Sequence, residues 1–152
     1  MVKHSVLLSK IEHINRHLSR LRPYSRLRLE HFLESPNAQD IVEYNLFQAI
    51  NHLIAMMEHI VVDEEYGLPQ SAADAAVILK SKKIFTAKDA DLVKKMVGFR
   101  NVVGHDYIHL DKRIVHTVLI KGVKDLRRVI AKLARKFKSW KNTNLILNNI
   151  QV

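Results

Sequence analysis

Three side chains that could act on a phosphodiester lie within eight residues, in the segment RNVVGHDY (residues 100–107). They are Arg100, His105 and Tyr107. A guanidinium can hold a charged phosphorus centre through two hydrogen bonds, and histidine is the side chain that exchanges its proton most readily near neutral pH. Together these groups could catalyse attack by a ribose 2′-hydroxyl on the adjacent phosphate. That reaction requires RNA, because DNA lacks the hydroxyl, and it requires no metal ion.

A purely structural explanation of the same residues stays open. Gly104 is a natural C-terminal residue for a helix that begins near Thr86, because glycine readily adopts the left-handed conformation that ends helices. Arg100 would then project from the last turn, and His105 and Tyr107 would follow in the exit loop. Cations also favour the negative end of a helix, so the arginine and histidine could serve as caps.

Other kinds of site find less support. The four glycines stand at positions 67, 98, 104 and 122, so neither a Walker-type phosphate loop nor a dinucleotide fingerprint can be written. His13 and His17 have the i, i+4 spacing of two zinc ligands, but no third ligand accompanies them, and a surface pair is the better interpretation. His52 and His59 lie in an apolar helix, where hydrogen-bonded or interface histidines are expected. We therefore expect no metal and no cofactor.

The net charge of +10 is unevenly distributed. Residues 1–79 hold 7 Lys/Arg and 10 Asp/Glu, net −3, whereas residues 80–152 hold 18 and 5, net +13. A cationic half of this kind attracts polyanions such as nucleic acid, although an ordinary solvated surface could have the same composition. The cations expected to contact an RNA backbone are Lys112, Arg113, Arg127 and Arg128, with Lys132, Arg135 and Lys136 beside them.

Length and composition are those of one soluble domain. The chain has 152 residues, of which 47% are hydrophobic, and it contains no cysteine, so disulfides and thiolate sites are excluded. Near the N-terminus, Lys, His or Glu interrupts every apolar run, so neither a signal peptide nor a membrane span is expected. These features favour a cytoplasmic protein.

Helices must position the segment 100–107, because apolar residues recur at helical spacing through most of the chain. Ser71 and Thr86 are each followed three residues later by Asp, which predicts capping boxes, and Asp111 is a good N-cap for the last helix. Turn signals typical of a sheet are absent. The sequence therefore predicts an all-α bundle of about four to five main helices over residues 1–138 and a tail over 139–152. The predicted helices cover 6–21, 27–33, 41–65, 72–81, 87–103 and 112–137.

The segment FRNVVGHDY resembles the motif of HEPN domains and, within them, of the HepT-like toxins of bacterial toxin–antitoxin pairs. In that motif a polar residue directly follows the arginine. Four residues in all separate the arginine from the histidine, and one residue separates the histidine from the tyrosine. Arg100, Asn101, His105 and Tyr107 fit it position by position. Helix order, size and charge agree over approximately residues 3–137, but only the motif is specific. Gly104 departs from the aliphatic residue that is more usual before the histidine.

The resemblance implies a homodimeric antiparallel bundle in which two copies of the motif meet at a cleft and act as a metal-independent endoribonuclease. Arg100 would hold the phosphate, His105 would be the general acid or base, and Asn101 would orient one of them. By the same resemblance, Tyr107 would be the position to which a partner, a minimal nucleotidyltransferase antitoxin, attaches AMP. The added phosphates would occupy the cations that RNA needs and fill the cleft.

Two alternatives stay open. A catalytically silent HEPN module could bind nucleotide or RNA and support a separate nucleotidyltransferase, although the intact arginine, histidine and tyrosine favour the enzyme. A helical scaffold could use a stripe containing Met56 and Met57 for oligomerisation.

Overall fold

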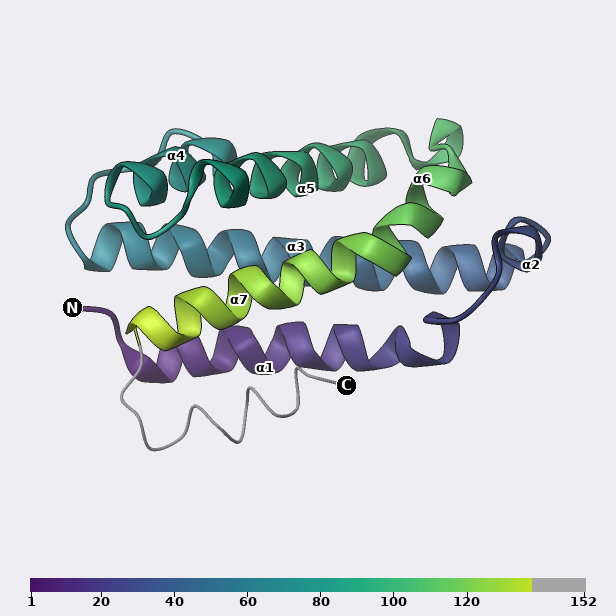
Figure 1. Cartoon of the computed structure of the whole chain (residues 1–152), viewed down its shortest axis with the longest axis horizontal. Helices are drawn as coiled ribbons and strands as arrows, with labels where there is room; N and C mark the ends of the chain where they lie inside the picture. The colour runs from purple at the N-terminus through teal and green to yellow at the C-terminus, as the bar shows by residue number, and fades with distance from the viewer. Residues whose placement is uncertain (138–152) are drawn as a thin grey trace.

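Three long helices, α1 (His4–Arg20), α3 (Pro36–Asp63) and α5 (Ala87–Asp106), form the frame of the computed structural model, which describes residues 1–137. Helix α3 lies between the other two and runs antiparallel to both (Figure 1). Over the described residues the fold is all-α, as predicted from the apolar spacing. The predicted boundary at residue 138 and the tail 139–152 lie outside the described residues.

Shorter elements close the bundle around this frame. A 3-10 turn (Arg22–Tyr24) and α2 (Leu29–Leu33) connect α1 to α3, and α4 (Ala72–Ser81) packs against α3 and α5. After α5, a second 3-10 turn, η2 (Tyr107–His109), leads into α6 (Lys112–Thr117), and α7 (Val123–Phe137) then runs back beside α1 (Figure 1). No helix within residues 1–137 is both long and apolar enough to cross a membrane.

Helix α3 is buried on more than one side because other helices pack on both of its flanks. Its apolar residues include Met56 and Met57, neither of which has any exposed surface. Both side chains are part of the core, so the interpretation of this stripe as an oligomerisation surface is wrong. Burying such side chains stabilises the fold by about 2 kcal/mol each.

The helix starts predicted from capping residues are confirmed at Ser71, Thr86 and Asp111, whereas the helix predicted over 41–65 begins earlier, at Pro36 after the N-cap Ser35. The hydroxyl of Ser71 accepts a hydrogen bond from the backbone N–H of Asp74 at 3.1 Å, and Asp111 accepts one from the N–H of Arg113 at 2.9 Å. Thr86 and Asp89 form a reciprocal capping box at the start of α5. Each cap satisfies backbone donors that the first turn of a helix leaves free, so these residues determine where the helices begin.

The fully buried carboxylate of Asp89 also anchors α7. It forms ion pairs with Lys132 and with Arg128, whose Nη1 lies 3.3 Å from Oδ1. Burial alone would raise the pKa of Asp89, but hydrogen bonds from Lys132 and Thr86 and the charge of Lys132 hold that pKa below its usual value. One side chain thus joins a helix start to the last helix of the bundle.

The last predicted helix, over residues 112–137, is interrupted. A π-turn at Val118–Gly122 separates α6 from α7. A Cβ on Gly122 would lie 3.0 Å from Cγ1 of Val118, so the wide turn leaves little room for a larger residue there. π-turns are rare and are frequently found at functional sites, and apolar spacing alone does not reveal them.

Candidate active site

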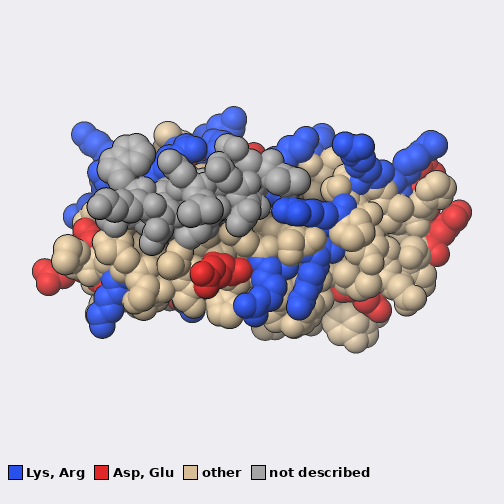
Figure 2. Space-filling model, turned by 90° about the horizontal axis from the view of Figure 1, so that it is seen from below, with Lys and Arg blue, Asp and Glu red and all other residues tan. Residues whose placement is uncertain are grey.

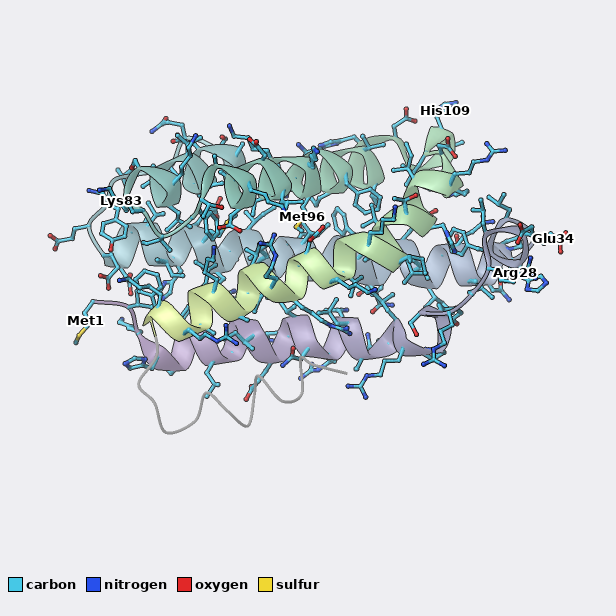
Figure 3. The ribbon with its side chains drawn as sticks, in the orientation of Figure 1. Met1, Arg28, Glu34, Lys83, Met96 and His109 are labelled. Atoms are coloured by element: carbon cyan, nitrogen blue, oxygen red, sulfur yellow. The ribbon has the colours of Figure 1, made fainter. Side chains whose placement is uncertain are left out.

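The segment 100–107 occupies the end of α5 and the start of η2, at the end of the bundle opposite Met1 (Figure 3). Helix α5 continues through Gly104 to Asp106, so the prediction that Gly104 ends the helix is wrong. Gly67 is the glycine with a positive φ among the described residues. His105 therefore belongs to the last helical turn, and Tyr107 begins the 3-10 turn.

Arg100 is half-buried and held from α3. Its Nη1 donates a hydrogen bond to Oδ1 of Asn51 at 3.2 Å, whereas its Nε is buried without a hydrogen-bond partner among residues 1–137. No carboxylate of the described residues pairs with this guanidinium. Its charge is thus available to an anion from outside, while Asn51 restricts its orientation.

Gly104 allows α5 to approach α3 closely. A Cβ at this position would lie 3.1 Å from Cε2 of Phe47, which is closer than ordinary van der Waals contact. One turn earlier on α3, the buried Glu43 forms an ion pair with Lys112 at the start of α6. Because α-helical residues four apart share a face, a single stripe of α3 contacts both Arg100, the first residue of the motif, and Lys112, beyond its last residue. That stripe consists of Glu43, Phe47 and Asn51.

The remaining motif side chains face solvent. Asn101, His105 and Tyr107 are all exposed, the last with 58% of its surface accessible. Asn101 and His105 are four residues apart and share a face of α5, so the amide lies where it can orient the imidazole. Arg100 and His105 are five residues apart, which places them about 140° apart around the helix axis. In one copy of the chain they therefore project toward different sides of α5.

Sequence reasoning missed two supporting features. Asn51 is one of several polar residues of α3, so its type alone does not single it out, and its partner is 49 residues away. Beyond His105, a second imidazole belongs to His109, whose Nδ1 lies 2.6 Å from Oδ1 of Asp106. His109 projects away from the bundle at this end (Figure 3).

The four cations predicted to contact RNA lie in different environments. Lys112 is engaged with Glu43, and Arg128 lies 3.3 Å from Asp89 and 3.9 Å from Asp125. Arg113 is exposed. Arg127 is half-buried, and its buried Nε has no hydrogen-bond partner among the described residues. Within residues 1–137, carboxylates therefore pair with Lys112 and Arg128 but not with Arg113 or Arg127.

Three histidines outside the motif, His13, His17 and His52, form a cluster between α1 and α3. The rings of His13 and His52 stack with their centroids 4.8 Å apart, and Nδ1 of His17 lies 2.9 Å from Oδ1 of Asn45. Burial lowers the pKa of His52, as do the nearby His13, His17 and Lys10. Because His17 is buried, the expected surface pair is wrong. No group of three ligands among residues 1–137 could hold a metal ion.

Fold and motif together define a class: an all-helical bundle that carries this arginine–histidine motif at the end of a long helix is a HEPN-type domain. Residues 14–133 match the family model described as ribonuclease HepT-like. The chain is also 30% identical over 125 residues to the mRNA nuclease HepT of Shewanella oneidensis, covering 82% of this chain and 93% of that protein. The chain belongs to the HepT-like ribonuclease family, and it is an RNA-cleaving enzyme.

Solved structures agree with this assignment. One is a crystal structure of a toxin–antitoxin with AMP-PNP, which shares the fold with a TM-score of 0.80 at 28% identity, over 87% of this chain and 99% of that one. Another is the tri-AMPylated HEPN toxin of Shewanella oneidensis in complex with an MNT antitoxin, with a TM-score of 0.80 at 28% identity, over 88% and 99%. The resemblance to HEPN domains noted from the sequence is thereby confirmed.

Proposed function

We propose that this protein is the toxin of a toxin–antitoxin pair and cleaves RNA in the cytoplasm without a metal ion, through Arg100 and His105. The observation that supports this most directly is the state of Arg100. Its guanidinium is oriented by Asn51, carries no carboxylate partner among the described residues, and lies on the same helix as an exposed histidine. A cation held in this way can bind a phosphate and stabilise the charge that develops in the transition state.

The reaction follows from the chemistry of RNA. The ribose 2′-oxygen attacks the adjacent phosphorus while a histidine acting as general base removes its proton. The bond from phosphorus to the leaving 5′-oxygen then breaks, and that oxygen takes up a proton. The products are a 2′,3′-cyclic phosphate and a 5′-hydroxyl. His105 is the proposed proton carrier, and Asn101 is the proposed positioning residue beside it.

We further propose that two copies of the chain share the site. Arg100 and His105 lie about 140° apart around α5, so one copy does not direct both groups toward a single phosphate. Large apolar side chains are exposed near the motif, including Ile108 at 74% and Ile114 at 52%. Exposed apolar surface of this kind marks interfaces. A second copy would cover these side chains and supply the complementary group.

The exposed phenol of Tyr107 is the proposed regulatory position. A relative of similar fold is tri-AMPylated and in complex with an MNT antitoxin. For this chain we propose a cognate minimal nucleotidyltransferase as partner. The Tyr107 oxygen would attack the α-phosphorus of ATP, pyrophosphate would leave, and the phenolic proton would pass to a base of the partner. The attached phosphate would compete with RNA for Arg100.

Among the cations of the basic half, Arg113 and Arg127 are the stronger candidates for contacts to the RNA backbone. Neither is held by a carboxylate of residues 1–137. Lys112 and Arg128 would have to reach a phosphate from within their ion pairs, so their contribution to RNA affinity is expected to be smaller.

The test is RNA cleavage by the purified protein in EDTA, with the mass of the intact chain recorded from the same preparation. His105→Ala should abolish cleavage, while His31→Ala, at an exposed histidine of α2, should leave it unchanged. Cyclic phosphate ends would support 2′-hydroxyl attack, and mass added in AMP units would be mapped to Tyr107. An unmodified dimer that leaves cellular RNA intact would instead identify a catalytically silent module that binds nucleotide or RNA.

A further inference from the structure

A pocket of about 480 Å³ lies where the end of α1 and the following 3-10 turn meet the π-turn and α7. Its walls are largely apolar, with Leu21 from the end of α1 and Leu119 from the π-turn among the lining residues. Four cations also line it, and no acidic side chain among the described residues does. They are Arg22, Arg26, Lys124 and Arg127.

None of these four cations has a counter-charge within residues 1–137. Arg127 is the extreme case, because its Nε is buried without a hydrogen-bond partner there, and burial together with Arg22 lowers its pKa. The next residue shows the contrast, since Arg128 lies 3.3 Å from the carboxylate of Asp89. A half-buried guanidinium beside other unpaired cations is costly unless an anion binds there.

The form of the pocket narrows the class of anion. Several positive charges around an apolar wall suit a polyanion whose negative charges are regularly spaced, with apolar groups between them. A nucleic acid strand has both, as phosphates alternate with riboses and stackable bases. On the face that carries α1 and α7, Lys and Arg side chains gather near the middle and continue toward the end where α1 stops (Figure 2).

We propose that this pocket binds the phosphodiester backbone of the RNA substrate at a distance from the bond that is cut. The proposal rests on the proposed function, which supplies RNA as the ligand. Lys112, just past the motif, and Arg127 are fifteen residues apart along α6, the π-turn and α7, or about 22 Å at helical rise. For a strand that stays stacked, at about the 3.4 Å per nucleotide of one strand of a duplex, six or seven nucleotides span that distance. A longer strand could therefore reach both places, and a very short one could not.

The experiment measures binding without cleavage. The probes are fluorescent 2′-O-methyl RNAs of 20 and 4 nucleotides, which lack the free hydroxyl needed for strand scission. Anisotropy titrations over a range of salt concentrations compare the wild type with Lys124→Glu/Arg26→Glu, two exposed positions at the pocket. The matched control is Lys80→Glu/Lys88→Glu, which makes the same change of charge at exposed positions of α4 and α5.

For the 20-nucleotide probe, each lost phosphate contact should reduce the magnitude of the slope of log affinity against log salt by about 0.7. Near 0.1 M salt, this corresponds to a loss of about fivefold in affinity per contact. The pocket variant should therefore lose about 25-fold, and clearly more than the control. The 4-nucleotide probe should lose less with the pocket variant than the 20-nucleotide probe does, because it cannot span both places and can bind at the motif alone. Equal losses for pocket variant and control would show a general effect of charge and overturn the proposal.

A second variant separates binding from folding. Arg127→Met keeps an unbranched apolar stem, although a shorter one, and removes the unpaired charge, so the melting temperature should hold or rise while affinity for the long probe falls. A lower melting temperature with unchanged RNA affinity would make Arg127 a structural residue and refute its role here.

The outcomes also distinguish this proposal from its premise and from a protein ligand. If the wild type cuts ordinary RNA but the pocket variant binds the long probe normally, the pocket assignment fails and the ribonuclease stands. If the wild type cuts no RNA while binding still depends on the pocket, the proposed function fails instead. Fluorescent hexaglutamate serves as a third probe, for an acidic protein ligand. A pocket variant that still binds RNA but no longer binds hexaglutamate would identify a docking site for an acidic protein and refute the proposal.

Discussion

Replacing Gly104 with alanine should weaken the fold, whereas the same replacement at Gly98 in the same helix should strengthen it. A Cβ at position 98 has no heavy atom within 4 Å, but at position 104 it would lie 3.1 Å from Cε2 and 3.7 Å from Cζ of Phe47. Both glycines are helical, so both substitutions gain about 0.5–1 kcal/mol by restricting the unfolded chain and favouring the helix.

The difference between the two sites is the cost of displacing Phe47. Inserting a methyl group into packed surroundings costs about 1–3 kcal/mol, which offsets or exceeds the helical gain at Gly104. The expected result is a gain of about 0.5–1 kcal/mol for Gly98→Ala and a loss of up to about 2 kcal/mol for Gly104→Ala. At 2–4 °C per kcal/mol for a chain of this size, the melting temperatures should differ by roughly 2–12 °C.

Urea denaturation of each variant, with and without Phe47→Leu, forms a double-mutant cycle that isolates the contact. In the leucine background Gly104→Ala should become stabilising, like Gly98→Ala. RNA cleavage should fall about three- to tenfold in Gly104→Ala alone, because a shift of α5 by a few tenths of an ångström moves His105. If Gly104→Ala stabilises the wild-type background as much as Gly98→Ala does, the close approach of α5 to α3 is not what requires glycine.

Three further predictions follow from the contacts of the bundle. Asn51→Ala removes the acceptor that orients Arg100. It should lower kcat for RNA cleavage about 10- to 100-fold, with a smaller change in KM. The control Asn37→Ala, at an exposed position of the same helix, should leave the steady-state kinetics unchanged. Asp89→Asn should cost about 2 kcal/mol in urea denaturation at pH 7, because it leaves two cations without their carboxylate. The pKa of Asp89 is depressed in the folded state, so its contribution to the free energy of unfolding is present above about pH 4 and is lost as the pH falls through the folded pKa. A wild type that is still about 2 kcal/mol more stable than the variant at pH 2 would contradict this. The pKa of His52 is also depressed, so protonation favours the unfolded chain. The melting temperature should therefore decline as the pH falls below about 6.5, and it should decline less steeply in His52→Gln. Identical profiles of melting temperature against pH for the wild type and this variant would refute the role of His52.

Much of the fold could be predicted from the sequence because its signals are local. Apolar spacing predicts each long helix, and Ser71, Thr86 and Asp111 mark helix starts through hydrogen bonds that span two or three residues. The π-turn could not be predicted in this way. Its apolar residues fit an α-helical spacing equally well, and only the packing of α7 distinguishes the two.

The chemistry of the motif could likewise be predicted, but its support could not. Gly104 has two possible roles, helix termination and close packing, and the choice depends on Phe47, which lies 57 positions earlier in the chain. Asn51 contacts Arg100 across 49 positions, and nothing in the neighbouring residues indicates that pairing. Contacts between distant segments are decided by tertiary packing, so residue types alone leave them undetermined.

The stripe of α3 that supports the motif also sets when during synthesis the site can form. Glu43 is made 69 residues before its partner Lys112, and that contact flanks the motif on its C-terminal side. At about 5–20 residues per second, roughly 3–14 s separate the two on the ribosome. Throughout that interval the nascent chain has α3 without the segments that complete the site. A ribonuclease made beside messenger and ribosomal RNA thus gains its support only when most of its own chain has been translated.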